Sequence, residues 1–472
     1  MIRTPQPSPY RPDPRILTLG DAFYDPVRPA SFPQHRLRFR NDRWAAAVGL
    51  DGLGEAEWAA HFGGFAPLAD NLSEPLALRY HGHQFRNYNP DLGDGRGFLF
   101  AQLRDGDGRL LDLGTKGSGP TPYSRFGDGR LTLKGGVREV LATEMLEALG
   151  VDTSKTFSLF ETGEELHRGD EPSPTRSAVM VRLSHGHIRI GSFQRLAWIK
   201  DAEAMDRLVR YSLAELYGEA PGSEPVVQLL DHVTRATARL AASYMAAGFV
   251  HGVLNSDNIA ITAESFDYGP WRFTPRWQPG FTAAYFDQEG LYAFGRQAEA
   301  IHWNLVQLAV ALRLIAPVEQ LTPPIEQFAA HYEEVFTRAI FDRLGIASRG
   351  EQEDMALLQV METALNGSAV EIDRFFFDWA GGRRRAPSPA DAIYAEPNFA
   401  GFVQAIGDFA PSRSLDHPYW QDDAPCSMHI GEVEAIWGDI AARDDWSAFE
   451  AKIAAVRRMG EAMGEGSAAP AA

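Results

Sequence analysis

The chain has 472 residues, 44% of them hydrophobic and 23% charged, which is typical of a folded protein with two or three lobes and excludes a mostly disordered chain. Its 45 Lys and Arg and 63 Asp and Glu residues give a net charge of −18, which disfavours binding to nucleic acid or to an anionic membrane. The single cysteine, Cys426, excludes an internal disulfide, and no stretch is apolar enough for a signal peptide or a membrane span. We expect a cytoplasmic monomer.

The first 200 residues divide into an arm and a sheet-rich lobe. Residues 1–75 open with a proline-rich stretch and continue in short mixed segments, which predicts an arm packed on the body of the protein. In residues 76–200, short runs of strand type alternate with glycine-rich turns. Two such runs, 98–103 and 109–113, flank an Asp-Gly turn and predict a hairpin in an antiparallel sheet.

Helical patterns dominate the rest of the chain. One helix is predicted inside the sheet-rich lobe, over about residues 136–149. Residues 201–345 are predicted to form a helical lobe, and residues 346–472 a helical C-terminal extension ending in a disordered tail. Apolar stripes of helical spacing lie within residues 208–216, 226–247 and 303–314. A sheet followed by helices predicts an α+β protein with two lobes and a cleft between them.

One segment has the spacing of a kinase catalytic loop, which runs His-x-Asp, four residues and Asn, before an Asp-Phe-Gly segment. Here Asn258 stands seven residues after His251, and Asp267-Tyr-Gly stands where Asp-Phe-Gly would be. The position of the kinase aspartate holds Val253, whereas a carboxylate stands at Asp257. The amide and carboxylate oxygens suit Mg²⁺ or Mn²⁺ bound together with phosphate. A turn in which these side chains only cap backbone groups would give the same pattern.

A kinase-like protein also needs a lysine that grips phosphate and a helix glutamate that orients it. Lys116 ends a predicted strand, and Glu139 lies on the following helix. Such a pair is otherwise common as a surface ion pair. The chain has no Walker A sequence around Lys116 or Lys134.

Glycines and arginines offer further contacts to phosphate. Two Asp-Gly-Arg segments lie within residues 92–97 and 126–130, where glycine allows close approach of backbone N–H groups and arginine adds charge. Tight hairpin turns would explain either segment equally. Arg182 and Arg189 stand seven residues apart across a predicted strand, turn and strand, so they either converge on one polyphosphate or face solvent.

Together these segments resemble the selenoprotein O family, which are kinase-like protein adenylyltransferases. The residues that carry the resemblance are Tyr80 to Phe85, Leu92 to Arg96, Gly117 to Arg125, Gly127 to Arg130, Arg189 with Ser192 and Phe193, His251 to Asn258, and Asp267 to Pro270.

The resemblance implies a bilobal protein-kinase-like fold in which ATP binds in a flipped orientation. AMP then passes to Ser, Thr or Tyr hydroxyls of protein substrates, and pyrophosphate is released. It implies that Asp257 is the catalytic base and that Asn258 and Asp267 hold Mg²⁺ or Mn²⁺. It places the following residues at the nucleotide: Gly93, Gly95, Arg96, Lys116, Asp128, Gly129, Glu139, Arg182 and Arg189.

Some features depart from the family pattern. The family usually has Arg-Ser-Ser before its helix Arg-Glu, whereas this chain has Lys134-Gly-Gly. Beyond about residue 400 the usual C-terminal segments have no counterpart, and Cys426 alone cannot form the family's internal disulfide switch. Three alternatives stay open: kinase-type phosphotransfer, transfer of UMP from UTP, and an inactive nucleotide-binding scaffold.

Overall fold

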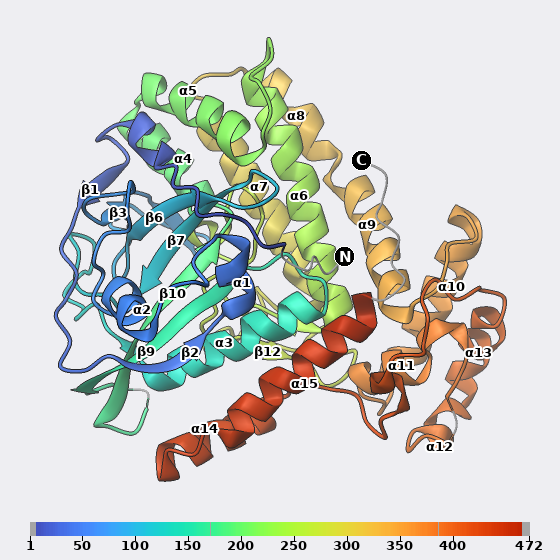
Figure 1. Ribbon diagram of the computed structural model, residues 1–472. Helices are drawn as coiled ribbons and strands as arrows, with labels where there is room; N and C mark the ends of the chain where they lie inside the picture. Colours follow the sequence, from blue (N-terminus) through green and yellow to red (C-terminus); the bar gives the residue numbers. More distant parts are fainter. Residues whose placement is uncertain (1–5, 170, 386, 465–472) are drawn as a thin grey trace.

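The computed structural model describes residues 6–169, 171–385 and 387–464. A sheet-rich lobe, built by the blue to cyan part of the chain, lies beside a helical lobe coloured green to orange (Figure 1). This is the α+β arrangement of two lobes that the sequence predicts. Apart from Gly464, the tail expected to be disordered lies outside the described residues. None of the helices described is long and apolar enough to cross a membrane.

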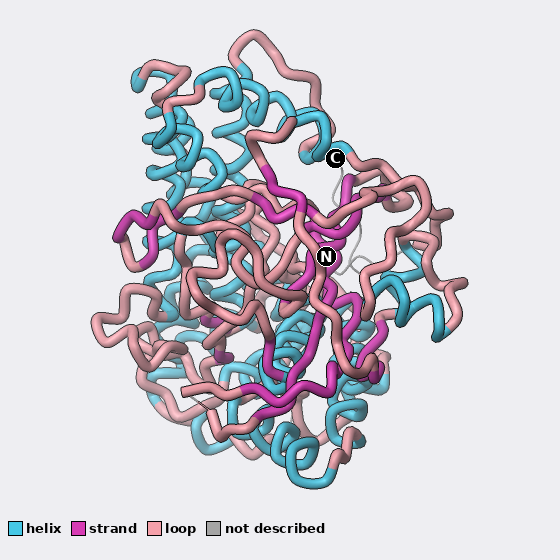
Figure 2. The backbone as a smooth tube through the Cα atoms, turned by 90° about the vertical axis from the view of Figure 1, so that its left-hand side faces the viewer, coloured by secondary structure: helices cyan, strands magenta, loops and turns pink. Residues whose placement is uncertain are grey.

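The sheet-rich lobe contains an eight-stranded antiparallel sheet in the order β1-β3-β6-β7-β10-β9-β2, with β8 also paired to β10. Its strands are β1 (Tyr24–Pro26), β2 (Arg36–Arg40), β3 (Leu76–Leu78), β6 (Leu99–Arg104), β7 (Leu110–Lys116), β8 (Leu131–Thr132), β9 (Lys155–Leu166) and β10 (Thr175–Ser184). In Figure 2 the strands run as a band through the middle of the view, with helices above and below it. The predicted hairpin is β6–β7, and its turn is fixed by Asp105, whose carboxylate accepts hydrogen bonds from the N–H groups of Asp107 and Arg109.

The N-terminal segment supplies both edges of this sheet, because β1 pairs with β3 and β2 pairs with β9. It also forms the 3-10 helix Arg15–Leu19 and two short helices, α1 (Asp42–Ala47) and α2 (Glu55–Phe62). Trp58 of α2 is fully buried and stacks on Phe157 of β9, with ring centroids 5.0 Å apart. The arm is therefore part of the core of the lobe.

Helix α3 (Leu133–Ala148) packs on β9 and β10 and is buried along almost its whole length. Its N-cap is Thr132, whose hydroxyl accepts a hydrogen bond from the N–H of Gly135 at 3.1 Å. Its other side is covered by α14 (Ile430–Arg443) and α15 (Ser447–Gly464), the red helices of Figure 1. Double coverage explains why α3 is buried on more than the single apolar face that its sequence predicts.

The helical lobe is built around α6 (Pro225–Ala247), which packs against its neighbours α7, α8 and α9. The other helices of the lobe are α4 (Ile190–Ile199), α5 (Ala202–Tyr211), α7 (Gln297–Leu312), α8 (Val318–Glu326) and α9 (Phe328–Leu344). Helix α6 ends at Gly248, which has a φ of 68°, the left-handed conformation that glycine adopts without strain. The predicted stripes 226–247 and 303–314 thus correspond to α6 and to most of α7.

Short elements complete the fold. Two small antiparallel strand pairs are β4 (Gly82–Gln84) with β5 (Asn87–Asn89), and β11 (Phe249–Val250) with β12 (Arg272–Phe273). The C-terminal extension adds α10 (Glu351–Leu365), α11 (Ile372–Asp378), α12 (Asp391–Tyr394) and α13 (Ala400–Ile406) before α14 and α15. Short 3-10 turns lie at 256–258, 294–296, 380–382, 397–399 and 418–421, and a π-helical turn follows α5 at 212–216.

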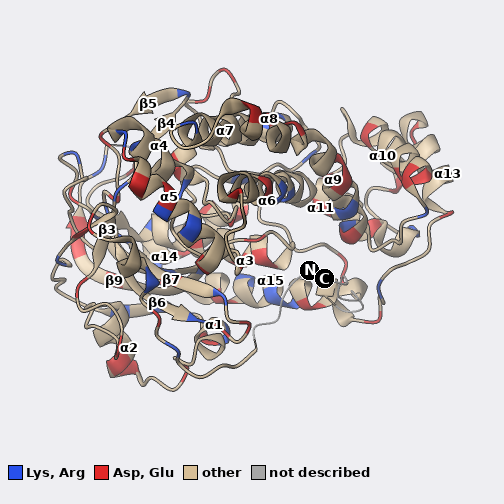
Figure 3. Ribbon diagram, turned by 90° about the horizontal axis from the view of Figure 1, so that it is seen from above, with Lys and Arg blue, Asp and Glu red and all other residues tan. Residues whose placement is uncertain are grey.

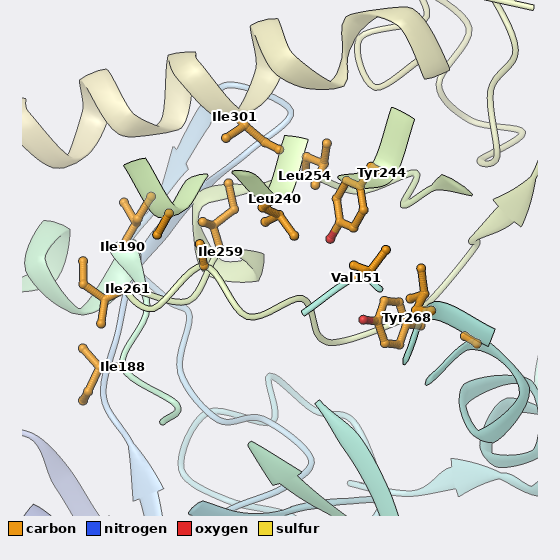
Figure 4. Packing of buried hydrophobic residues seen from close by; sticks show 14 of the residues in the cluster. Val151, Ile188, Ile190, Leu240, Tyr244, Leu254, Ile259, Ile261, Tyr268 and Ile301 are labelled. Carbon is orange, nitrogen blue, oxygen red and sulfur yellow. The ribbon is translucent and has the colours of Figure 1, made fainter. Parts of the chain in front are cut away.

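An apolar seam joins the two lobes next to the predicted catalytic loop. The segment that leaves β10 pairs with the segment after Asn258, through hydrogen bonds from Ile190 N to Ile259 O (3.0 Å) and from Ile261 N to Ile188 O (2.8 Å). Figure 4 shows these four isoleucines close to one another, with Leu240 and Leu254 nearby. Because these side chains are buried, the loop between His251 and Asn258 is fixed relative to both lobes.

Charged residues of both signs are interspersed over the helices. Figure 3 shows Asp or Glu together with Lys or Arg on α6 and α15. Several of them form ion pairs one helical turn apart, such as Asp231 with Arg235 on α6 and Glu334 with Arg338 on α9. Exposed pairs of this kind add little to stability.

Candidate active site

The predicted lysine and glutamate meet under the sheet. Lys116, the last residue of β7, is buried, and its Nζ lies 2.5 Å from Oε2 of Glu139 on α3. The same Nζ lies 2.7 Å from Oδ1 of Asp267. Glu139 is completely inaccessible to solvent, so this is a structural and electrostatic unit of the interior rather than a surface ion pair.

Arg182 brings a second positive charge to the same carboxylates. Its Nη1 lies 3.5 Å from Oε1 of Glu139 and 3.5 Å from Oδ1 of Asp267, distances of charge attraction without a hydrogen bond. The guanidinium also lies 5.8 Å from the ring centroid of Phe266. Although burial opposes it, the charges of Lys116 and Arg182 hold the pKa of Asp267 well below its usual range. Asp267 is therefore ionised at neutral pH.

Arg189 links three segments of the chain at the junction between the lobes. Its Nη1 donates to the backbone carbonyl of Asp257 at 3.0 Å, and its Nη2 lies 3.1 Å from Oδ1 of Asp94. The guanidinium stacks over the rings of Tyr80 and Phe266, at 4.3 Å and 4.9 Å from their centroids. Arg189 thus positions the backbone of the catalytic loop and leaves its Nε without a partner among the described residues.

The carboxylate of Asp257 is buried and only partly satisfied. Its Oδ1 has no hydrogen-bond partner among the residues that the structure describes. Gly82 leaves room for it, since a Cβ there would lie 3.1 Å from that oxygen. Burial raises the pKa of Asp257 to about 6, and the nearby charge of Arg189 opposes the rise. A carboxylate of this pKa can accept a proton at neutral pH.

The loop around Asp257 is held by hydrogen bonds on both sides. The side-chain amide of Asn258 donates to the carbonyl of Val253 at 3.0 Å, which turns its Oδ1 away from that contact. His251 is buried, burial lowers the pKa of its ring, and its Nε2 lies 3.0 Å from the carbonyl of Phe266. The latter contact ties the catalytic loop to the Asp267 segment. The hydroxyl of Ser256 donates to Oε1 of Gln194 on α4 at 2.6 Å.

The first glycine-rich segment packs closely on the loop that follows β7, and the role of Gly93 and Gly95 at a nucleotide stays a prediction. A Cβ at Gly93 would lie 2.3 Å from Cγ of Tyr123, and one at Gly95 would lie 2.9 Å from the Tyr123 carbonyl. The two glycines therefore let the loop 117–130, between β7 and β8, lie directly on this turn. Arg96 is exposed, and its charge helps to lower the pKa of Asp267.

The second glycine-rich segment lies outside the cluster formed by Lys116 and its partners. Asp128 is exposed, forms an ion pair with Arg168 at 2.9 Å, and accepts a hydrogen bond from the N–H of Arg130 at 3.0 Å. Gly129 has a φ of 67° and lies so close to Gly119 that a Cβ would be 2.1 Å from its carbonyl carbon. A role for Asp128 and Gly129 at a nucleotide stays a prediction.

Some residues of the site were not predicted. Asp94 lies within the first Asp-Gly-Arg segment, but its ion pair with Arg189 depends on a contact between residues 95 positions apart. Tyr80 and Phe266, which flank the Arg189 guanidinium, have no spacing signal that links them to that arginine. No group of three or more His, Cys, Asp or Glu residues within the described part of the chain could hold a metal ion by itself.

Comparisons with known proteins agree on one family. The sequence profile described as "Protein adenylyltransferase SelO" matches residues 9–394. A curated relative from Gloeobacter violaceus, named "Protein nucleotidyltransferase YdiU", is 43% identical over 462 residues, covering 94% of this chain and 95% of its own. Relatives of the same name from Synechocystis and Trichormus variabilis are 41% and 44% identical, covering 93% and 95% of this chain and 96% of each relative.

Solved structures give a weaker likeness. The Toxoplasma gondii rhoptry antigen kinase domain is 11% identical and superposes with a TM-score of 0.28, covering 56% of this chain and 83% of that one. A second T. gondii protein, described as a virulence factor with a protein-kinase fold and no enzymatic activity, is 12% identical with a TM-score of 0.26, covering 56% of this chain and 74% of that one.

Proposed function

This chain belongs to the SelO family of protein adenylyltransferases, and from that premise we propose that it transfers AMP from ATP to Ser, Thr or Tyr hydroxyls of other proteins. The observation that carries the proposal is the buried, partly unsatisfied carboxylate of Asp257, one residue before Asn258 and within electrostatic range of Asp267. It offers a proton acceptor beside a cluster suited to hold polyphosphate.

The reaction requires one proton transfer and one exchange of bonds at phosphorus. The acceptor oxygen forms a bond to the α-phosphorus, the bond from that phosphorus to the bridging oxygen of the β-phosphate breaks, and pyrophosphate leaves with the electron pair. The hydroxyl proton passes to the carboxylate of Asp257. Val253 occupies the usual kinase base position and cannot accept a proton, which leaves Asp257 in that role.

Positive charge for the polyphosphate comes from Lys116, Arg182 and Arg96. The first two are buried, where charge interactions with phosphate are less screened than at the surface. Glu139 holds Lys116 in place when phosphate is absent. Arg189 acts beside them by fixing the backbone of Asp257.

We assign Asn258 and Asp267 to a divalent cation, either Mg²⁺ or Mn²⁺. The residues fit this role, because Asp267 is ionised and because the amide orientation of Asn258 leaves Oδ1 available. A cation bound there would neutralise phosphate charge in the transition state. With only two protein ligands, the remaining coordination falls to phosphate oxygens and water.

The test is incubation of the protein and an acceptor protein with ATP labelled at either the α- or the γ-phosphate. Incorporation from the α position, with a mass gain of one AMP per modified hydroxyl, is expected. Incorporation from the γ position alone would identify a phosphotransferase, and no incorporation from either would identify an inactive scaffold. Competition between ATP and UTP in the same assay identifies the preferred donor.

A further inference from the structure

Strand β4 lies against the loop that carries Asp257 and is bonded to side chains of that loop. The N–H of His83 donates to the hydroxyl of Ser256 at 2.6 Å, and the N–H of Phe85, directly after the strand, donates to Oδ1 of Asn255 at 3.0 Å. Two backbone donors of this segment thus find their acceptors in consecutive residues of the catalytic loop rather than in another strand.

Gln194 of α4 completes this contact from a third element. Its Nε2 donates to Nδ1 of His83 at 2.7 Å, and its Oε1 accepts a hydrogen bond from the hydroxyl of Ser256 at 2.6 Å. Because the serine hydroxyl then both donates and accepts, its orientation is fixed. Gln194 and Ser256 are buried, and α4, β4 and the turn at 256–258 all contact one another. We call Gln194, Ser256 and His83 the Gln194 network.

The position of the Asp257 carboxylate depends on the backbone that carries it. Its Oδ1 has no hydrogen-bond partner among the residues that the structure describes. Gly82, which precedes His83, lies so close that an added Cβ would be 3.0 Å from Cβ of Asp257. Arg189 donates to the carbonyl of Asp257 at 3.0 Å. The loop is therefore held at residue 257 by Arg189 and at the preceding residue by the side chain of Ser256.

Loss of the Gln194 amide would release the first of these two residues. An apolar side chain at position 194 would leave the hydroxyl of Ser256 without its acceptor in the interior. The serine would then regain a partner only through another rotamer or a shift of the loop. Reacting groups must be held to within a fraction of an ångström, so a small shift at residue 256 is enough to slow transfer.

We propose that Gln194 is a positioning residue for adenylyl transfer, which acts through Ser256 on the loop that carries Asp257. This inference rests on the proposed function and adds a residue that none of the spaced motifs singles out. The effect falls on the transfer step rather than on ATP binding. The network is bonded to the loop beside Asp257, whereas the buried charges assigned to the polyphosphate, Lys116 and Arg182, lie on β7 and β10.

The test uses two substitutions of Gln194 and one matched control. Gln194→Leu removes both hydrogen bonds, and Gln194→Glu keeps an oxygen that accepts from Ser256. Gln228→Leu is the control, because Gln228 on α6 also donates through Nε2, to Glu219 at 2.9 Å, and accepts through Oε1, from the N–H of Gly222 at 2.9 Å. Each variant is measured for its single-turnover rate with α-labelled ATP, its Kd for ATP and its Tm.

Gln194→Leu should transfer AMP about tenfold to a hundredfold more slowly with a Kd for ATP within about twofold, as expected when a catalytic group is slightly misplaced. Gln194→Glu should stay within about threefold of the native rate, and Gln228→Leu should keep that rate. Ser256→Ala should lose a similar factor. The double variant Gln194→Leu, Ser256→Ala should be no slower than the slower single variant, because both changes break the same hydrogen bond.

Hydrogen–deuterium exchange reports on the loop without requiring transfer. In Gln194→Leu, exchange should become several-fold faster in peptides covering residues 82–86 and 250–259, because the N–H of His83 loses an acceptor of fixed orientation. Exchange in α10 should not change.

A native rate in Gln194→Leu, or an equal loss in Gln228→Leu, would overturn the inference while leaving adenylyl transfer intact. If Gln194→Leu does not fold, a native rate in Ser256→Ala overturns it in the same way. Faster exchange confined to the two segments, with no transfer by the native protein, would support the role of Gln194 in fixing the loop and refute the proposed activity. No transfer together with unchanged exchange would refute both.

Discussion

Asp257 combines burial, an unsatisfied oxygen and a raised pKa in one side chain. We predict that Asp257→Asn keeps the fold and binds ATP with an affinity within a few-fold of the native protein. Its single-turnover rate of AMP transfer should fall by about 10²-fold or more, the contribution of a positioned general base. Asp231→Asn, at an exposed carboxylate on α6, is the control and should transfer at the native rate. A near-native rate for Asp257→Asn would exclude that carboxylate as the base.

Glu264 gives a prediction about pH and stability. It is fully buried and accepts a hydrogen bond from the N–H of His185 at 2.7 Å. Burial, reinforced by Asp152, raises its pKa from 4.5 to about 8. The folded state therefore holds a proton that the unfolded state releases, so this residue's contribution to stability is full below pH 4.5 and is lost as the pH rises toward 8.

Glu264→Gln keeps the acceptor oxygen and removes the titration. We expect the variant to gain stability relative to the native protein as the pH rises from 5 to 8, by at most about 1.4 kcal/mol per pH unit. Urea denaturation at a series of pH values measures this. A stability difference that does not change with pH would show that Glu264 is ionised in the folded protein throughout.

For single residues, the sequence predicts those that belong to motifs with a characteristic spacing. Lys116 and Glu139 meet as expected from their positions in a kinase-like pattern, whereas the contact of Lys116 with Asp267 was not predicted. The pairing of Asp94 with Arg189 could not be predicted, because it depends on how distant segments fold together. Nor could the packing of Gly93 on Tyr123, since the same glycine pattern suits phosphate binding equally well.

Helix α15 packs on α3 and so stabilises the position of Glu139, the glutamate that pairs with Lys116. Arg457 of α15 forms two hydrogen bonds to the buried carboxylate of Glu144, at 2.7 Å and 2.8 Å. Arg457→Ala should lower the free energy of unfolding by about 1–3 kcal/mol, because Glu144 would remain buried with fewer partners. Arg338→Ala removes an exposed pair on α9 and should change stability by less than about 0.5 kcal/mol.

Thermal or urea unfolding of the two variants decides between these outcomes. The double variant Arg457→Ala, Glu144→Ala should recover part of the loss, since it no longer buries a carboxylate that has lost its closest arginine. Equal stability of Arg457→Ala and Arg338→Ala would mean that solvent satisfies Glu144 as well as the arginine does.

Some of the regular elements could be predicted from local pattern. The β6–β7 hairpin and helices α6 and α7 lie where alternation and helical spacing place them. The turn after α5 is π-helical over residues 212–216, which a stripe of apolar residues does not reveal. Helix α3 begins at Leu133, before the two glycines, because Thr132 caps it.

For the whole molecule, ligand binding should stabilise both lobes together, since the proposed nucleotide contacts come from each. Mg·ATP at about 100 times its Kd should raise the Tm by roughly 3 °C. Asp267→Ala should lose most of this shift, whereas Glu334→Ala on α9 should keep it. Differential scanning fluorimetry with and without EDTA measures the effect. The same shift in Asp267→Ala, or with EDTA present, would contradict the assigned metal ligand.

The order of the two lobes was predictable from the succession of strand and helix patterns, whereas the position of the N-terminal arm was not. Strands β1 and β2 are short, and β2 reads Arg-Leu-Arg-Phe-Arg with charged residues that suit an exposed edge. Which edge each strand joins depends on pairing with β3 and β9, far along the chain.

The same two edge strands determine when the sheet can close during translation. When a ribosome has produced β2, its partner β9 is still more than a hundred residues from being translated, and the sheet cannot close until that strand has emerged. Helix α3 is covered only after α15 has been translated, and α15 begins almost three hundred residues after α3 ends. A nascent chain therefore exposes the unpaired edge until β9 emerges and the uncovered flank of α3 until α15 emerges, and in these intervals chaperones and proteases have access to them.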